Sequence, residues 1–444
     1  MLKLRNSLAI IACKMLIRLG VLMGKKGSSL PGSIAMRISP SVLKALASQI
    51  KKEIILVCGT NGKTTTNNLI YSLLSNDGST VVCNNVGANM LPGVACAFIS
   101  KAKISGKLNA DYAAIECDEA SLRHIVKHLT PHKIVITNLF RDQMDRYGEI
   151  EGTIKLINEA IDKVPDTMLI LNADDPFTRQ FGKGRKAIYY GVSENVLSPE
   201  DTESVLCLEC QSPLSYEYNH YNQLGKYSCP SCGFCRPNPH YSATRVDIQG
   251  SLKFVLSFKG VQHKMNVNYR GFYNVYNILA SFAVFESAGG DIQSAKEVFD
   301  AYKPQLGRME PFTIGGKAVI LNLAKNPAGF NQALSAVSAD NRTKNVLIAV
   351  NDAPSDGIDI SWLWDTNFES LCKSDIKTVY VSGTRMYDVA LRLKYAGVKN
   401  VKTVEINADT LKELTCQSGE VCYLLVNYTV LFGTQSILKE LEDK

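Results

Sequence analysis

The chain has 444 residues, which is enough for two or three domains with separate hydrophobic cores. Hydrophobic residues make up 45% of the sequence and charged residues 20%, which excludes a disordered or fibrous protein. The net charge of +7 favours anionic ligands or membrane surfaces, but it does not by itself indicate nucleic-acid binding.

The first 50 residues are predicted to form a basic amphipathic helical segment. Lys14 and Arg18 interrupt the apolar residues, so no run approaches the ~20 residues that a transmembrane helix needs. A secretory signal would have a cleaner apolar centre and a small-residue cleavage site. We therefore expect a helix packed on the body of the protein, with peripheral contact to an anionic membrane surface as the alternative.

From Lys51 to about residue 195, short apolar runs alternate with amphipathic segments. The runs EIILVCG, DYAAIEC, HKIVITN and MLILNAD are typical of buried parallel strands. Helical segments such as SLRHIVKHL lie between them. This alternation predicts a doubly wound α/β domain.

A phosphate-binding loop is predicted where the first strand ends, in GTNGKTT. Glycines let backbone amides face an anion without a Cβ in the way, the lysine suits the β- and γ-phosphates, and the first threonine hydroxyl suits magnesium. The following helix presents N–H donors at its N-terminus. Val57 replaces the first glycine of the longer form of this motif. We assign nucleotide binding to Gly59, Thr60, Asn61, Gly62, Lys63, Thr64 and Thr65.

Carboxylates follow a later strand of the same expected sheet. Glu116 ends that strand, where ligands collect in open α/β sheets, and its hard oxygen could hold magnesium together with Thr64. Asp118 and Glu119 are expected to cap the next helix.

Two CxxC pairs interrupt the α/β pattern between residues 200 and 240. Each turn presents two thiolates to one ion, and two turns complete a tetrahedron. The spacing predicts a closed, structural zinc ribbon, with buried reduced thiols as the alternative. Cys235 is a spare cysteine at a worse spacing. The predicted ligands are Cys207, Cys210, Cys229 and Cys232.

Seven motifs then occur in one order: GTNGKTT, IE, NLFRDQMDRYGE, LNADDP, GFYNVYNILA, GRME and NLAKNP. Their order and spacing, between about residues 50 and 330, resemble those of the Mur ligase family. The resemblance implies that ATP activates a carboxylate as an acyl phosphate, which an amine then attacks. It also implies catalytic roles for Lys63 and Glu116, a place for Asn274 near the adenine, and a contact between Arg308 and the nucleotide.

The sequence departs from the amino-acid-adding members of that family. Gln143, Tyr273 and Lys325 stand where those ligases have histidine. About fifty residues precede the phosphate loop, so we expect no UDP-binding domain. A different acceptor is therefore favoured, with an amino-acid-adding ligase as the alternative. A zinc-ribbon, nucleic-acid-dependent ATPase is a further alternative, but no dense Lys/Arg stripe supports nucleic-acid binding.

A second α/β domain is expected after the GRME motif. We predict an N-terminal segment over 1–50, a Mur ligase-like central ATP-binding domain with a parallel sheet over 51–305, and a C-terminal α/β domain over 306–444. In the last domain, an apolar strand opens into NDAPSDGID, which carries Asp352, Asp356 and Asp359.

The ligase core, the four-cysteine insert and this C-terminal domain together resemble the MurT branch of the Mur ligase family. The resemblance implies a cytoplasmic ligase subunit of lipid II isoglutaminyl synthase, acting at the inner face of the membrane in peptidoglycan synthesis. It would amidate the α-carboxylate of D-glutamate in lipid II, using ATP, Mg²⁺ and ammonia from a GatD-like glutaminase partner.

The chain itself offers no credible Cys–His pair for hydrolysing glutamine. One aspartate of NDAPSDGID could complete the partner's catalytic triad. We favour Asp359, which follows a glycine turn and begins ISWLW, with Asp356 and Asp352 as alternatives.

Overall fold

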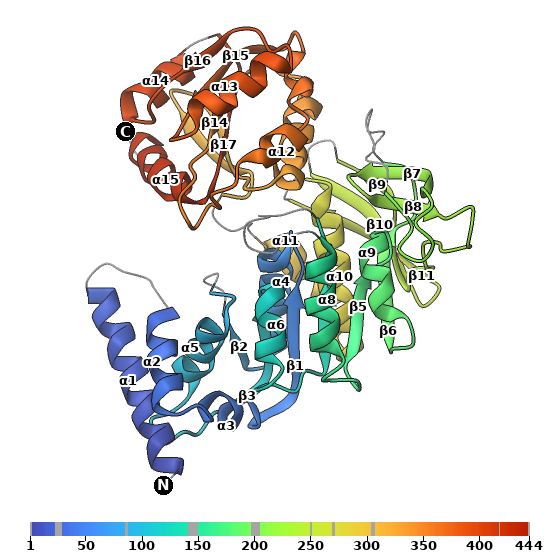
Figure 1. The fold of residues 1–444 in the computed structure, drawn as a ribbon. Helices are drawn as coiled ribbons and strands as arrows, with labels where there is room; N and C mark the ends of the chain where they lie inside the picture. The colour runs from blue at the N-terminus through green and yellow to red at the C-terminus, as the bar shows by residue number, and fades with distance from the viewer. Residues whose placement is uncertain are drawn as a thin grey trace. The chain divides into compact units, whose positions relative to one another are not determined.

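The computed structural model describes residues 2–22, 29–84, 88–140, 150–196, 205–248, 251–268, 271–302, 307–416 and 418–442. They form two compact units. The first is built from residues within Met1–Leu139 and Ile150–Tyr302, and the second mainly from residues within Lys303–Lys444. Figure 1 shows the elements of both units.

Three helices precede the sheet of the first unit: α1 (Leu2–Leu22), α2 (Ser29–Ile38) and α3 (Val42–Ala47). Helix α2 packs closely on α5 (Leu91–Lys101) because Gly32 lies at the contact. A Cβ at Gly32 would come within 1.8 Å of the carbonyl oxygen of Pro92, so a larger residue would force the two helices apart.

A nine-stranded sheet forms the centre of the first unit, in the order β11-β10-β9-β6-β5-β4-β1-β3-β2. The seven strands from β2 to β9 pair in parallel, and β9, β10 and β11 pair antiparallel. The bounds are β1 (Ile50–Cys58), β2 (Val81–Cys83), β3 (Ala110–Glu116), β4 (Lys133–Ile136), β5 (Met168–Asn172), β6 (Ala187–Val192), β9 (Tyr241–Asp247), β10 (Leu252–Phe258) and β11 (Val261–Val267).

Helices cover both faces of this sheet. The chain runs from β1 to the edge strand β2 and then back towards β3, β4 and β5, so right-handed crossovers place its helices on opposite faces. Helices α4 (Lys63–Asn76), α10 (Tyr273–Ser287) and α11 (Ile292–Ala301) contact one another on one side. Helices α5, α6 (Glu119–Ile125) and α8 (Ile150–Ile161) form the other layer.

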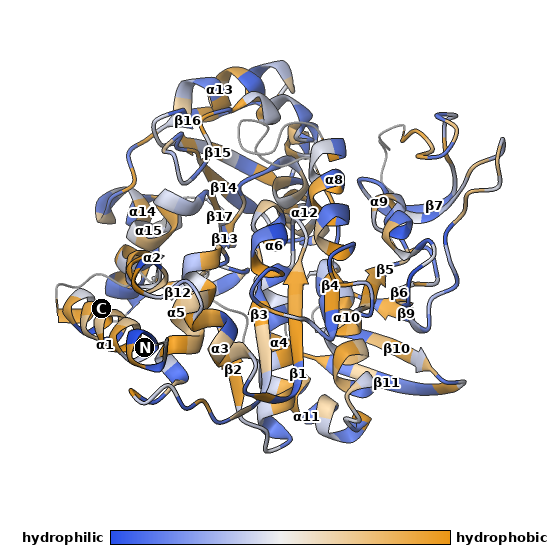
Figure 2. Cartoon of the chain, turned by 60° about the horizontal axis from the view of Figure 1, so that its bottom comes forward, coloured by the Kyte–Doolittle hydropathy of each residue, from blue (hydrophilic) through white to orange (hydrophobic). Residues whose placement is uncertain are grey.

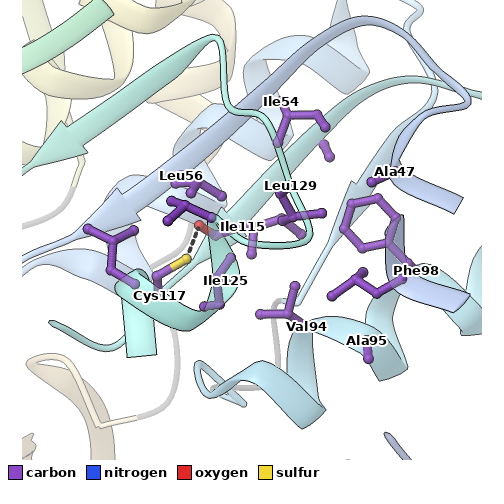
Figure 3. Close-up of a cluster of buried hydrophobic side chains, with 14 of the residues drawn as sticks. Ala47, Ile54, Leu56, Val94, Ala95, Phe98, Ile115, Cys117, Ile125 and Leu129 are labelled. Atoms are coloured by element: carbon purple, nitrogen blue, oxygen red, sulfur yellow. Dashed lines mark hydrogen bonds between the residues drawn. The ribbon is translucent and has the colours of Figure 1, made fainter. Parts of the chain in front are cut away.

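The core between the sheet and α5 is almost free of solvent. Ile54 and Leu56 of β1, Ile115 of β3 and Phe98 of α5 are all at most 4% exposed and pack in one cluster (Figure 3). Figure 2 shows β1 as a strongly hydrophobic strand, which is expected for a strand buried on both faces. This core fixes the carboxyl ends of β1, β3 and β4, where the candidate site lies.

A small hairpin is inserted between β6 and β9. It consists of β7 (Ser215–Tyr221) and β8 (Leu224–Ser228), which form a separate two-stranded sheet. The short helix α9 (Pro176–Arg179) and the 3-10 helix η1 (Gln180–Gly182) follow β5. Arg179 places its guanidinium over the ring of Phe234 in the insert, 3.9 Å from the ring centroid.

The second unit contains a six-stranded sheet in the order β12-β13-β17-β14-β15-β16, parallel except for the β12–β13 pair. The strands are β12 (Glu310–Ile314), β13 (Lys317–Leu323), β14 (Lys344–Ala349), β15 (Ile376–Ser382), β16 (Val401–Thr403) and β17 (Val421–Val426). The helices are α12 (Pro327–Ala339), η2 (Ser361–Asp365), η3 (Phe368–Cys372), α13 (Met386–Tyr395), α14 (Ala408–Cys416) and α15 (Tyr428–Glu442).

Hydrophobic clusters cover both faces of this second sheet. The expected fold class is therefore confirmed: an α/β central domain with a mostly parallel sheet and a cysteine-bearing insert is followed by a second α/β domain.

Candidate functional site

The predicted phosphate loop joins β1 to α4. Gly59 and Gly62 adopt φ angles of 122° and 83°, which residues with a Cβ rarely adopt. A Cβ at Gly59 would lie 2.3 Å from Oγ1 of Thr137, and one at Gly62 would lie 2.3 Å from Oδ1 of Asn277. The two glycines therefore serve both the left-handed turn and the close approach of neighbouring segments.

Helix α4 begins at Lys63, immediately after the loop. The first N–H groups of a helix have no partner within the helix, and its N-terminus carries a partial positive charge. Thr64 and Thr65 lie in this first turn, where their backbone amides and hydroxyls can face an anion. The seven assigned residues therefore form one continuous stretch from the end of β1 into the first turn of α4.

The Lys63 side chain is buried and lies inside the loop. Its ammonium donates to the carbonyl oxygens of Gly59 and Thr60, the latter at 3.1 Å, and forms an ion pair with Glu119 at 3.0 Å. Burial raises the pKa of the Glu119 carboxyl, while the Lys63 ammonium acts in the opposite direction. The ion pair holds the lysine beside the turn of the loop.

This contact corrects the expectation that Asp118 and Glu119 both cap the next helix. Asp118 is the cap of α6, because its side chain accepts from the backbone N–H of Ser121 at 3.3 Å. Glu119 occupies the first position of α6 and turns to Lys63 instead. Sequence spacing could not reveal this pair, because 56 residues separate the partners.

The segment after β4 clamps the phosphate loop. The carbonyl oxygen of Asn138 accepts from Thr60 N at 2.8 Å, and its side chain exchanges hydrogen bonds with the backbone of Asn61 at 2.9 and 3.0 Å. Oγ1 of Thr137 donates to the Asn61 carbonyl oxygen at 2.7 Å. Neither residue was assigned a role from the sequence, although Asn138 is the first residue of the motif NLFRDQMDRYGE and Thr137 directly precedes it.

The start of α10 covers the same loop from the other side. Oγ1 of Thr66 donates to Oδ1 of Asn277 at 3.3 Å, and Nδ2 of Asn277 donates to Oδ1 of Asn274 at 3.0 Å. Asn274 is 4% exposed. A chain of side-chain hydrogen bonds therefore connects Asn274, through Asn277, to Thr66 near the start of α4.

Glu116 lies at the end of β3 and is 3% exposed. Its backbone exchanges two hydrogen bonds with the Asn84 side chain, both at 2.8 Å. Nδ2 of Asn89 donates to Oε1 of Glu116 at 3.1 Å. Within the described part of the chain, its second oxygen, Oε2, is buried without a hydrogen-bond partner. Such an oxygen is expensive to bury unless a ligand satisfies it, which fits a cation site.

Cys58 ends β1 beside the loop and is fully buried. Burial raises the pKa of its thiol well above the ordinary value, with the nearby Glu119 carboxylate adding to the effect. A buried thiol that resists ionisation is a poor nucleophile. The residue beside the phosphate loop is therefore unsuited to glutamine hydrolysis.

The four predicted zinc ligands come together in the insert. Their sulfur atoms all lie within 4.8 Å of one another, and the Cys207–Cys232 and Cys210–Cys229 pairs are each 3.5 Å apart. A tetrahedral ion with Zn–S bonds of about 2.3 Å needs sulfurs roughly 3.8 Å apart, so this set fits zinc. Cys235 is exposed and lies outside the set.

The insert is tied to the sheet beside the phosphate loop. Arg236, just after the cysteines, forms a buried ion pair with Asp174 at 2.6 Å, and the Tyr276 hydroxyl donates to the same carboxylate at 2.8 Å. The Gln223 amide, in the β7–β8 turn, donates to the carbonyl oxygen of Leu139 at 2.6 Å. Leu139 directly follows the clamp residue Asn138, so the insert supports the segment that holds the loop.

The three aspartates of NDAPSDGID have different surroundings. Asp352 pairs with Arg385 at 2.8 Å and accepts from Oγ1 of Thr384 at 2.8 Å; the Thr384 hydrogen bond is the main reason why its pKa lies below the ordinary value. Asp356 is 3% exposed and accepts from the backbone and hydroxyl of Thr429 at the start of α15.

Asp359 is half-buried and accepts from the backbone N–H and hydroxyl of Ser361 at 2.8 and 3.0 Å. It therefore supports the start of η2, a 3-10 helix where the sequence suggested an ordinary helix. Of the three, Asp356 is the most deeply integrated into its own unit.

Other predicted positions belong to different parts of the chain. Arg308 is half-buried before β12, and Lys325 is half-buried between β13 and α12, both in the second unit. Tyr273 begins α10 in the first unit. Gln143 lies outside the described residues.

Residues 57–226 match the Mur ligase middle domain, and residues 323–431 match the MurT ligase C-terminal family. The chain is 37% identical over 432 residues to the MurT subunit of lipid II isoglutaminyl synthase (glutamine-hydrolyzing) from Staphylococcus aureus N315, which covers 96% of both chains. The chain belongs to the MurT family. A second MurT subunit, from Streptococcus pneumoniae R6, is 36% identical over 449 residues and covers 98% of both chains.

The fold has a solved counterpart in a pseudomurein peptide ligase type C from Methanothermus fervidus, with a TM-score of 0.71 over 89% of this chain and 80% of that one. At 23% identity, this likeness supports the fold alone. Membership of the MurT family makes the chain a ligase of the Mur type, for which ATP and Mg²⁺ are the implied cofactors. Membership of this family also favours a Mur-type ligase over the alternative of a nucleic-acid-dependent ATPase.

Proposed function

We propose that this chain is the ligase subunit that amidates lipid II. In this reaction the α-carboxylate of D-glutamate in the stem peptide attacks the γ-phosphorus of ATP, which yields ADP and an acyl phosphate. Ammonia then attacks the acyl carbon, inorganic phosphate leaves, and the nitrogen loses a proton as the carboxamide forms. The observation that carries the proposal is the identity of 36–37% to MurT subunits, which extends over both units of the chain.

The nucleotide phosphates would bind at the start of α4. The loop amides and Lys63 supply positive potential, and the clamp by Thr137 and Asn138 keeps the loop in one conformation before the nucleotide arrives. A preorganised site of this kind stabilises the charge that develops during phosphoryl transfer without first reordering solvent. Asn274 is proposed to lie near the adenine, and Arg308 is proposed to contact the nucleotide.

Magnesium would be held by Glu116 together with Thr64. The buried Oε2 atom of Glu116 supports this proposal, because a carboxylate oxygen is a ligand that Mg²⁺ prefers. The ion would neutralise phosphate charge during the transfer. Zinc is proposed to have a structural role: four cysteine sulfurs would complete its coordination and leave no open position for a substrate.

The ammonia is proposed to come from a GatD-like glutaminase partner. Free ammonia is scarce near neutral pH. Cys58, beside the phosphate loop, is a buried thiol whose pKa is raised, so it is a poor nucleophile for releasing ammonia from glutamine. One aspartate of this chain would then orient the histidine of the partner's triad. We favour Asp359 because it is half-buried and lies at the exposed start of η2, whereas the carboxylate of Asp356 is buried against α15.

The acceptor would place the reaction at the inner face of the membrane. Lipid II combines a pyrophosphate with a long apolar tail, and Lys325 is proposed to contact a phosphate or carboxylate of that substrate. No helix in the described part of the chain is long and apolar enough to cross a membrane. We propose a peripheral contact with that membrane surface.

The deciding experiment is to incubate the purified chain with lipid II, ATP, Mg²⁺ and ammonium, and to weigh the lipid product by mass spectrometry. Conversion of a carboxyl to a carboxamide, with stoichiometric ADP and phosphate, is the expected result. ADP release without this conversion would contradict the proposed acceptor. If there is no turnover, the assay is repeated with the glutaminase partner, and continued absence of product would contradict the amidation itself.

A further inference from the structure

Helix α1 has two distinct faces. Its inner face carries Ala9, Ile10 and Cys13, which are all fully buried. Its outer face carries large apolar side chains separated by 4, 7, 4 and 3 residues, so they form one stripe along the helix. These side chains and their exposed fractions are Leu4 (68%), Leu8 (51%), Met15 (58%), Leu19 (51%) and Leu22 (84%).

Polar contacts fix the rotation of α1 so that this stripe points outward. Arg5 donates to the carbonyl oxygen of Ile38 at 3.0 Å, and Lys14 donates to the carbonyl oxygen of Ser100 at 3.0 Å. Asn6 accepts from the hydroxyl of Ser39 at 2.6 Å. The outer stripe is therefore a defined surface and not the result of a loosely attached helix. Within the first unit, α1 lies at the outer edge, beside α2 (Figure 1).

The N-terminal segment that carries this stripe has charged residues of a single sign. The first 52 residues contain ten Lys and Arg and no Asp or Glu. The rest of the chain has 39 basic and 42 acidic residues, a net charge of −3, so the net positive charge of the protein comes entirely from the N-terminal segment. Lys3, Arg18, Arg37 and Lys44 of this segment are exposed on the three N-terminal helices.

We propose that the outer face of α1 docks this protein on an anionic lipid surface. The helix would lie in the plane of the interface, with its five apolar side chains among the acyl chains and the basic residues at the headgroups. Contiguous exposed apolar surface usually marks an interaction site, and the one-signed charge selects the partner. A second copy of the same face would bring like charges together, which disfavours self-association through α1.

This inference does not depend on the proposed ligase activity. It would be tested with the full-length chain and vesicles of phosphatidylcholine, with and without phosphatidylglycerol, that contain no peptidoglycan precursor. We expect co-sedimentation with the phosphatidylglycerol vesicles only, and weaker binding as the salt concentration rises. Replacing two leucines of the stripe, Leu8→Glu with Leu19→Glu, should lower the affinity by at least about tenfold.

The matched control is Val261→Glu, which places a carboxylate at an apolar position that is 52% exposed at the start of β11. It should bind vesicles as the native chain does. Circular dichroism and nucleotide binding confirm that each variant is folded. The proposal is overturned if the native chain ignores anionic vesicles, if the double variant binds them equally well, or if the double variant instead loses a native dimer. A failed amidation assay would not contradict vesicle binding through α1, and a failed vesicle assay would not contradict the proposed amidation.

Discussion

The side-chain amide of Gln223 donates a hydrogen bond of 2.6 Å to the carbonyl oxygen of Leu139, across 84 residues of sequence. Gln223 lies in the hairpin of the cysteine insert and is 4% exposed. Leu139 follows Asn138, whose side chain and carbonyl oxygen hold the phosphate loop. One buried hydrogen bond therefore connects the insert that carries the candidate zinc site to the segment that clamps the candidate nucleotide site.

Replacing Gln223 with alanine should weaken ATP binding. The change leaves the Leu139 carbonyl oxygen buried without this donor, which costs about 1–3 kcal/mol and loosens the segment that clamps the loop. We expect the dissociation constant for ATP, measured by titration calorimetry, to rise by about three- to tenfold. Lys226→Ala, an exposed change in the same hairpin, is the control and should leave ATP affinity unchanged.

Glu116→Gln should raise the magnesium requirement of the enzyme. The amide keeps the shape of the side chain but removes the negative charge that would hold the cation. The Mg²⁺ concentration for half-maximal ADP release should rise by about tenfold or more. Asp118→Asn, two residues away, only weakens the cap of α6 and should leave the Mg²⁺ dependence unaltered. An equal shift in both variants would argue against Glu116 as a ligand.

Cys207→Ser should remove zinc and destabilise the insert. A closed four-cysteine site contributes its binding free energy to folding, so losing one thiolate costs several kcal/mol locally. Metal analysis should show less than one zinc per chain, and proteolysis should begin within residues 205–240. Cys235→Ser removes a cysteine outside the cluster and should retain the metal. Zinc loss from both variants would show that the ligand set is wrong.

Asp359→Asn should separate the two halves of the proposed reaction. Glutamine-dependent amidation should fall by about 10³-fold or more, because an amide cannot orient the partner's histidine as a carboxylate does. Turnover with added ammonium should continue at the native rate. Asp365→Asn, an exposed change at the end of the same 3-10 helix, should affect neither. If Asp359→Asn loses both activities, Asp359 has a structural role in this chain and does not belong to the partner's catalytic triad.

The stability of the first unit should decrease as the pH rises from about 4 to about 7. Burial raises the pKa of Asp175 from 3.8 to about 7. The backbone hydrogen bonds from Leu139 and Phe177 lower this pKa, but their effect is smaller than that of burial. Its protonated form is therefore favoured in the folded state, and the stabilisation present below the unfolded pKa is lost as the pH passes through the folded value.

The loss should be at most about 4 kcal/mol, by the usual conversion of pKa shifts into free energy. Urea unfolding of the native chain and of Asp175→Asn at a series of pH values would measure it. Asparagine cannot titrate, so its profile should be flatter over this interval even if the variant is less stable throughout. Parallel profiles would exclude Asp175 as the source.

The sequence by itself determined the elements that depend on local order. Gly59, Gly62 and Lys63 after an apolar run indicate an anion-binding turn, because backbone freedom, charge and a helix start are all contained in seven consecutive residues. Two CxxC turns indicated a cluster of four sulfurs, because each turn presents two thiolates to one ion and a tetrahedral ion needs four. The α/β alternation followed from strand and helix periodicity, and the structure has both expected sheets.

Only the tertiary structure decided which distant residues meet at these elements. Lys63 pairs with Glu119 instead of extending from the loop, Asn138 clamps the loop, and Gln223 supports the clamp. These partners are brought together by the parallel order of β1, β3 and β4 and by the folding of the insert beside them. The periodicity of the sequence does not reveal such contacts, because a hydrogen bond depends on the positions of two groups in space and not on their separation along the chain.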